Sequence, residues 1–136
     1  FQEELNIVKS TTTDNRPVVN KVISAAEIEA FQHLVRRVPV TDNVIEYAVK
    51  LVHKTRPGGE LANADTKNYL EWGAGPRASQ NLILAAKCNA LINGKYSPDI
   101  EDVQAIANLV LRHRIVRNFK AEAEGISVNE IVKRLV

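Results

Sequence analysis

Apolar residues recur every three or four positions along most of this 136-residue chain, whereas the alternating pattern of a half-buried strand is scarce. Such spacing puts the apolar side chains of each segment on one face of a helix. Those faces can leave water only by packing against one another around a shared core. The sequence therefore predicts an all-α fold, a bundle of about five or six helices.

Signals that begin a helix divide the chain into segments. Ser24–Glu27 and Ser127–Glu130 are capping boxes, in which a hydroxyl and a carboxylate satisfy amides that the first turn leaves unpaired. Thr41-Asp42 and Ser97-Pro98-Asp99 are two further expected starts. The stripes expected to be buried are Ile28, Phe31, Val35 and Val38; Val44, Ala48, Leu51, Val52 and Thr55; Leu82, Ile83, Ala86, Ala90 and Leu91; Val103, Ile106, Ala107, Val110 and Leu111; and Ile131, Val132 and Leu135.

The segments between these helices carry loop and turn signals. Phe1–Lys9 has the spacing of a helix end, and the polar stretch Ser10–Pro17 that follows is typical of a linker. Residues 60–67 are polar and irregular, which predicts a loop. Very short strands are expected, if any, near Val18–Ile23 and Tyr69–Trp72.

The start of the chain suggests a piece of a longer protein. The sequence contains no Met at all, so we expect it to have been cut from a larger chain, with residues 1–23 as the end of a preceding domain plus a linker and residues 24–136 as the helical bundle. Phe1–Glu4 lacks the basic and apolar parts of a signal peptide, and no apolar run approaches the roughly 20 residues that span a bilayer. A cytoplasmic, non-membrane location is expected.

The composition excludes several kinds of site. The net charge of +2 is smaller than that of most dedicated nucleic-acid-binding domains, so a nucleic-acid partner is not expected. Cys88 is the single cysteine, so it can form no internal disulfide and no cysteine-based zinc site, and it is interpreted as a packing residue. His33, His53 and His113 stand on different expected helices without helix-spaced acidic or histidine partners, so no metal site is predicted.

The chain also lacks the parts of a nucleotide hydrolase. No Gly precedes Gly-Lys-Ser or Gly-Lys-Thr at the spacing of a phosphate-binding loop, and Gly94-Lys95 is followed by Tyr96. No apolar strand ends in the paired acids that hold magnesium in such enzymes. The chain by itself is therefore not expected to be a catalyst.

The most informative segment is Trp72–Ser79. Its glycines allow a sharp bend, and Pro76 suits the first position of a long helix that should end at Asn93-Gly94. Arg77 would then lie in the first turn, where a cation opposes the helix dipole by a few tenths of a kcal/mol up to about 1. An anion from outside the helix would relieve this, and a guanidinium grips phosphate oxygens well. The alternative, which the residue pattern alone favours, is a surface arginine bonded to a neighbouring helix's carboxylate.

A basic segment lies near the C-terminus. No acidic residue occurs between Asp102 and Glu122. The pattern fits a solvated helix end whose cations suit the dipole, and it also fits a surface for nucleic acid or a partner protein. The cations concerned are Arg112, Arg114, Arg117 and Lys120.

Several of these segments resemble one family. Trp72–Ser79, Trp-Gly-Ala-Gly-Pro-Arg-Ala-Ser, is similar to the W-G-A-S-P-R-A-S stretch of MoxR-type AAA+ ATPases and departs from it only at Gly75. Val35–Val40, Leu111–Arg114, Glu122–Gly125 and Phe1–Glu4 resemble further blocks of the same family in the same order. The resemblance implies the C-terminal helical lid of an AAA+ ATPase, with residues 1–23 as the end of the ATPase core and the linker.

The resemblance also implies a site. Arg77 falls at the family's sensor-2 position, which implies contact with the terminal phosphates of ATP and coupling of hydrolysis to lid motion. Ala74, Gly75 and Pro76 would be backbone neighbours of the nucleotide. The phosphate loop and the ligands of Mg²⁺ would belong to the core, so the lid would contribute to an ATPase only when joined to it.

The family resemblance also indicates an assembly and partner proteins. The resemblance implies a homo-oligomeric ring, often a hexamer, with chaperone-like action on protein complexes and von Willebrand A-domain proteins as partners. The alternative function is a helical module that binds nucleic acid through the basic segment, or one that only binds proteins.

Overall fold

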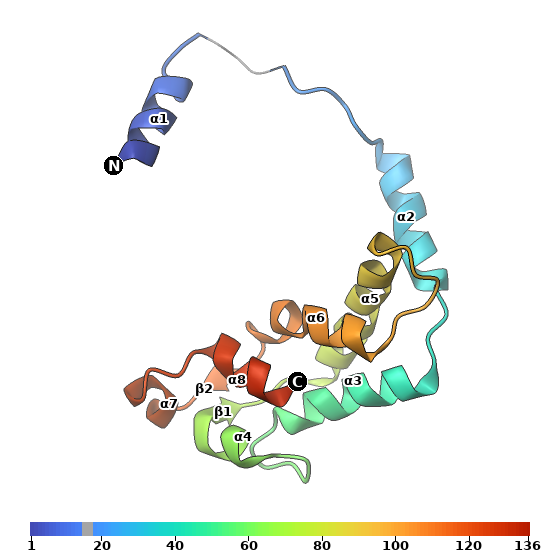
Figure 1. Cartoon of the computed structure of the whole chain (residues 1–136), viewed down its shortest axis with the longest axis vertical. Helices are drawn as coiled ribbons and strands as arrows, with labels where there is room; N and C mark the ends of the chain where they lie inside the picture. The colour runs from blue at the N-terminus through green and yellow to red at the C-terminus, as the bar shows by residue number, and fades with distance from the viewer. Residues whose placement is uncertain (15–17) are drawn as a thin grey trace. The chain divides into compact units, whose positions relative to one another are not determined.

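Helices make up most of the computed structural model, which describes residues 1–14 and 18–136 (Figure 1). The chain forms two units, residues 1–30 and 31–136. The all-α prediction is confirmed, with one two-stranded sheet in the described part. The elements are α1 (Gln2–Thr11), α2 (Ala25–Arg37), α3 (Asp42–Lys54), α4 (Ala64–Tyr69), β1 (Leu70–Trp72), α5 (Pro76–Ile92), α6 (Ile100–Leu111), β2 (Val116–Arg117), α7 (Phe119–Ala123) and α8 (Val128–Leu135).

In the first unit the helix predicted at Phe1–Lys9 is confirmed, whereas the predictions for the two segments that follow it are corrected. α1 continues through Ser10 and Thr11, whose hydroxyls donate to Ile7 O at 2.9 and 2.8 Å, so the polar stretch begins inside a helix. Residues 15–17 of the expected linker lie outside the described residues. The possible strand at Val18–Ile23 is wrong: the segment has no regular structure and its valines are exposed.

The capping box before α2 is confirmed. Ser24 N donates to Glu27 Oε2 at 2.7 Å, and Glu27 N donates to Ser24 Oγ at 3.2 Å. The hydrogen bonds from Ser24 lower the pKa of the Glu27 carboxyl. The stripe predicted for this helix is only partly buried, because Val38 lies in the core whereas Phe31 is 56% exposed.

The core lies in the second unit, between α3, α5, α6 and α8. The stripes predicted for α3, α6 and α8 are all buried, and so are Leu82, Ala86 and Ala90 of α5. A fully buried leucine contributes roughly 1.5–3 kcal/mol relative to an exposed one. The largest buried side chains are Leu51, Leu82, Leu111, Ile131 and Leu135.

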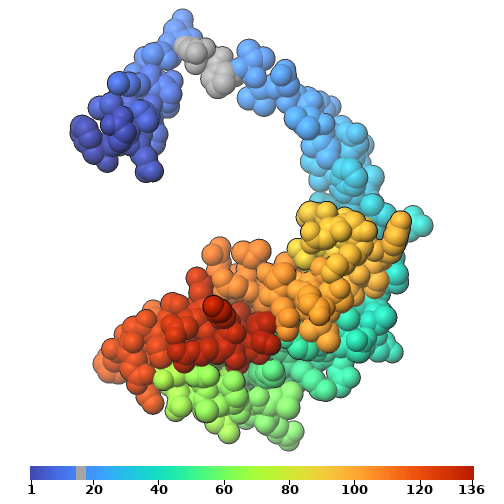
Figure 2. Space-filling view, in the orientation of Figure 1, coloured from blue at the N-terminus to red at the C-terminus, as the bar shows by residue number. Residues whose placement is uncertain are grey.

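A short helix replaces part of an expected loop, and an expected short strand is present. Asn63 caps α4 by accepting from Thr66 N at 2.8 Å, so the predicted loop at 60–67 is wrong in its second half. β1 pairs with β2 antiparallel, which confirms the short strand expected near Trp72. In Figure 2 the C-terminal helix, in red, lies against the green α4 segment, where Arg134 pairs with Asp65 at 3.1 Å.

The start of α6 differs from the prediction by two residues. Asp99, not Ser97, is the N-cap, and it forms a capping box with Asp102. Ser97 Oγ instead donates to Pro39 O at 3.1 Å. Carboxylates are at least as good as hydroxyls at this position, and a first-turn acid favours the dipole, so the later start wins.

Two other expected caps are also only partly formed. Thr41 stands at the N-cap of α3 but its side chain makes no cap hydrogen bond. Ser127 Oγ accepts from Glu130 N at 3.1 Å at the start of α8. The Glu130 carboxylate, however, pairs with Arg134 rather than completing the box.

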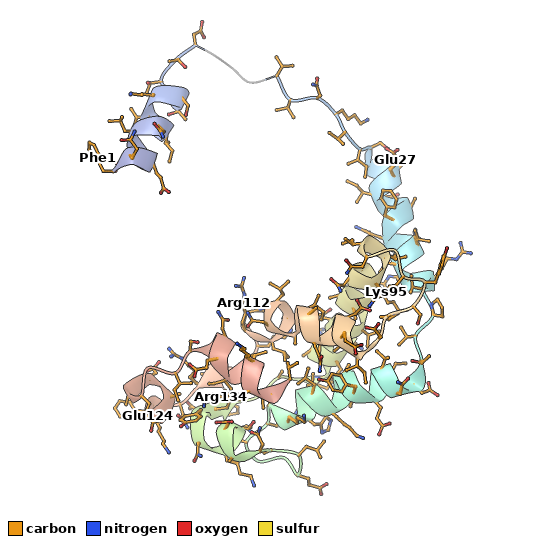
Figure 3. The ribbon with its side chains drawn as sticks, viewed as in Figure 1. Phe1, Glu27, Lys95, Arg112, Glu124 and Arg134 are labelled. Carbon is orange, nitrogen blue, oxygen red and sulfur yellow. The ribbon has the colours of Figure 1, made fainter. Side chains whose placement is uncertain are left out.

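A buried carboxylate joins the end of α5 to the start of α6. Asp102 is buried and accepts from Asn89 Nδ2 at 2.7 Å and from Lys95 Nζ at 3.1 Å. Lys95, labelled in Figure 3, also pairs with Asp99 at 2.7 Å. Both acceptors of this ammonium belong to the start of α6, and Asn89 of α5 donates to one of them, so the cluster holds the connection between the two helices in place. The hydrogen bond from Lys95 lowers the pKa of the Asp99 carboxyl well below its usual range, and the bond from the Asp102 amide adds to this.

We expect stability to depend on this carboxyl at acid pH. A pKa lowered by folding means that Asp99 stabilises the fold above its unfolded pKa of about 3.9, and that this stabilisation is lost as pH falls below that value. The free energy of unfolding of the wild type should therefore exceed that of Asp99→Asn above about pH 5, and the gap should narrow below about pH 4. Denaturant titrations across this range measure it, and a gap that does not change with pH would contradict it.

Candidate functional site

The loop between β1 and α5 is clamped to the end of α3. A Cβ on Gly73 would lie 2.4 Å from Thr55 O and 2.6 Å from Arg56 Cα, so only glycine fits there. The buried Ala74 N donates to Thr55 Oγ1 at 2.9 Å, and Ala74 O accepts from Arg56 Nε at 3.0 Å. Both polar groups of this backbone unit are therefore satisfied by the two residues that follow α3, which fixes where the next helix begins.

The start of α5 is as predicted. Gly75 is the N-cap in an extended conformation and Pro76 occupies the first turn. A Cβ on Gly75 would meet nothing within 4 Å. The serine that stands here in the similar family motif would therefore fit, and the departure at this position leaves the backbone path unchanged.

Arg77 is exposed in the first turn of α5, a turn without an acidic residue. Within residues 1–14 and 18–136 its guanidinium forms neither an ion pair nor a side-chain hydrogen bond. The alternative of an arginine bonded to a neighbouring helix's carboxylate is therefore not what the structure contains. An unpaired cation at this end of a helix is slightly unfavourable and attracts an anion.

The Arg77 side chain borders a surface hollow. Its volume is about 560 Å³, and its lining contains no carboxylate. Arg36, a basic residue in the last turn of α2, also lines this hollow. No local signal reveals this, because the two arginines are 41 positions apart. The lining residues are Arg36, Arg77, Gln80, Asn81 and Leu84.

Comparison with known proteins identifies the kind of domain. Residues 62–135 match the family model described as "AAA lid domain". The chain belongs to the AAA lid domain family. The MoxR type indicated by the sequence motifs is confirmed by a relative of the chain that is itself named Chaperone MoxR1.

Two curated relatives and one solved structure align with most or all of the chain. The Chaperone MoxR1 of Mycobacterium tuberculosis is 31% identical over 88% of the chain, and the uncharacterized protein YeaC of Bacillus subtilis is 29% identical over all of it. A crystal structure described as a "putative ATPase" from Cytophaga hutchinsonii matches with a TM-score of 0.82, 29% identity and 98% coverage. The chain spans 32%, 40% and 41% of these three proteins, respectively.

The basic segment of this lid is largely occupied by contacts within the domain. Arg117 Nη1 donates to Ile126 O at 2.7 Å, and Lys120 Nζ lies 5.6 Å from the centre of the Tyr69 ring. Arg114 donates to Val110 O at 3.4 Å. Arg112 projects from the end of α6 (Figure 3). These contacts favour a structural role for Arg114, Arg117 and Lys120 over a surface for nucleic acid.

The remaining candidate residues form no site. The three histidines are exposed, and the described residues contain no group of three or more His, Cys, Asp or Glu able to hold a metal ion. Cys88 is half-buried on α5, where it lines an apolar hollow of about 410 Å³ with Phe31 and Leu91. None of the helices in the described part is long and apolar enough to cross a membrane.

Proposed function

We propose that this lid senses bound nucleotide through Arg77, which contacts the terminal phosphates of ATP held by a MoxR-type ATPase core. The observation that carries the proposal is the exposed, unpaired guanidinium at the first turn of α5, bordering a hollow without carboxylates. A guanidinium donates two parallel hydrogen bonds to phosphate oxygens, and these are stronger when the acceptor is charged. Ala74, Gly75 and Pro76 are the backbone neighbours of the nucleotide in this proposal.

The residues present fit a triphosphate but not its metal ion. The cations and carboxamides of the hollow suit phosphate oxygens. Mg²⁺ requires oxygen ligands such as carboxylates, and no such group gathers in the described residues. In the proposal Mg²⁺ is held by the core and neutralises phosphate charge there, while Arg77 orients the phosphate end and links it to the lid.

In this proposal, closure of the lid over the core depends on which nucleotide is bound. In this proposal residues 1–23 are the end of the core and the linker, and residues 24–136 are the lid. An unpaired Arg77 finds its partner only when the lid meets bound nucleotide, so ATP favours the closed state over the open one. Loss of the terminal phosphate removes that difference and couples hydrolysis to lid motion.

The whole protein acts as a chaperone-like ring in this proposal. One relative is named a chaperone. Homo-oligomeric assembly, with a hexamer as the expected size, would place one lid beside each nucleotide. Remodelling or maturation of protein complexes, von Willebrand A-domain partners and a cytoplasmic location complete the proposal.

The test is ATP hydrolysis by the full-length protein with Arg77 replaced. Turnover should fall steeply in Arg77→Ala, partly recover in Arg77→Lys, which keeps the charge but not the paired donors, and stay near wild type in Arg112→Ala. Equal turnover in wild type and Arg77→Ala would refute the role of Arg77.

A further inference from the structure

Arg36 lies at the end of α2 and shares the hollow of about 560 Å³ with Arg77. The other lining residues follow Arg77 along α5 at intervals of three, four and seven, so they form one face of that helix. Lys87, three residues further along the same face, donates from Nζ to Arg36 O at 3.2 Å. This bond ties the end of α2 to α5 and holds Arg36 beside the hollow.

Neither arginine of the hollow is neutralised. Within the part of the chain that the structure describes, the Arg36 side chain forms no hydrogen bond or ion pair, and the same holds for Arg77. Some other arginines of the lid do have partners: Arg56 donates to Ala74 O, and Arg134 pairs with Asp65. Two cations that share a pocket repel each other, and this repulsion is relieved when an anion binds between them.

We propose that Arg36 is a second ligand of the nucleotide's phosphates, so that the lid grips the triphosphate end of ATP with one guanidinium from α2 and one from α5. This inference rests on the proposed function of Arg77. The carboxamides of Gln80 and Asn81, on the same face, offer neutral N–H donors to the remaining oxygens.

A triphosphate suits this hollow better than a single carboxylate. Each guanidinium has five N–H donors in a planar fork, and a lone carboxylate has two oxygens to accept them. A terminal phosphate carries three free oxygens and more charge, so it accepts hydrogen bonds from two guanidinium groups that approach from different directions. Binding by both guanidinium groups therefore favours ATP over nucleotides with fewer phosphates.

The test uses full-length protein and a non-hydrolysable ATP analogue with Mg²⁺, with ADP and AMP as comparisons. Isothermal titration should show that Arg36→Ala lowers affinity for the analogue by about tenfold, the loss typical of one charge-assisted contact. Affinity for AMP should not change. Arg36→Lys should retain part of the affinity, and Arg36→Glu should lose more than Arg36→Ala.

The adjacent arginine supplies a matched control. Arg37 is exposed at the same helix end but does not line the hollow, so Arg37→Ala should bind like the wild type. Equal affinities in the Arg36→Ala and Arg37→Ala variants would overturn the inference, even if Arg77→Ala binds weakly as the proposed function requires. An effect of Arg36→Ala on subunit assembly, seen by gel filtration, with unchanged affinity for the analogue would also overturn it, since the partner would then be a carboxylate of another subunit.

Discussion

Replacing Arg77 by alanine is expected to slow ATP hydrolysis by the full-length protein by tenfold or more. The exposed guanidinium has no partner within the described residues, so the fold loses nothing when it is removed. What is lost is a charge-assisted contact to phosphate, which contributes about 1.5–3 kcal/mol. Each 1.36 kcal/mol is a factor of ten in rate, so the expected loss is roughly 10- to 150-fold. Steady-state turnover at saturating ATP measures it.

The control for this prediction is another exposed arginine. Arg112 lies at the end of α6 and does not line the hollow beside Arg77. Circular dichroism and gel filtration should show that Arg77→Ala and Arg112→Ala are folded and assembled like the wild type. A tenfold loss in both variants would point to a general effect of surface charge rather than to a contact made by Arg77.

Replacing Gly73 by alanine is expected to destabilise the lid by about 1–3 kcal/mol, the usual cost of forcing extra volume into a packed site. The added Cβ would lie 2.4 Å from Thr55 O and 2.6 Å from Arg56 Cα. Both are backbone atoms at the end of α3, so they cannot swing away as a flexible side chain would. Denaturant unfolding of this chain measures the loss. In the full-length protein the displaced loop should also slow hydrolysis, because it positions the first turn of α5, which carries Arg77.

Gly75 provides the comparison for this substitution. A Cβ there meets nothing within 4 Å, and the backbone is extended rather than left-handed. Serine is a somewhat better N-cap than glycine, so Gly75→Ser should change the free energy of unfolding by only a few tenths of a kcal/mol, in the stabilising direction. Similar losses in Gly73→Ala and Gly75→Ser would show that the close approach to α3 does not govern this loop.

Local patterns in the sequence were enough to predict much of the fold. The stripe of α3 and the stripe of α6 are buried as expected, because a helix places residues three and four apart on one face whatever it packs against. The capping box of Ser24 and the start of α5 at Pro76 also formed as predicted, since each depends on atoms within one turn.

The sequence predictions were wrong where contacts between distant residues, rather than neighbouring residues, decide the local structure. Asp99 rather than Ser97 caps α6, and Asn63 begins α4 in a segment that was expected to be a loop. α4 forms from a polar segment because Thr66 is buried and donates to Lys54 O at 2.6 Å, a bond between residues 12 positions apart. The valines at 18–23 have strand propensity but no partner strand among the described residues, so they remain irregular.

By itself the sequence determined the all-α class, the positions of the long helices and the placement of Arg77 in the first turn of one of them, because each follows from spacing within a few residues. The tertiary structure alone decided that Arg77 has no internal partner, that Arg36 shares its hollow and that three cations of the basic segment are occupied within the domain. The physical reason is that charges are paired or left free by contacts between distant segments, and such contacts leave no periodic signal along the chain.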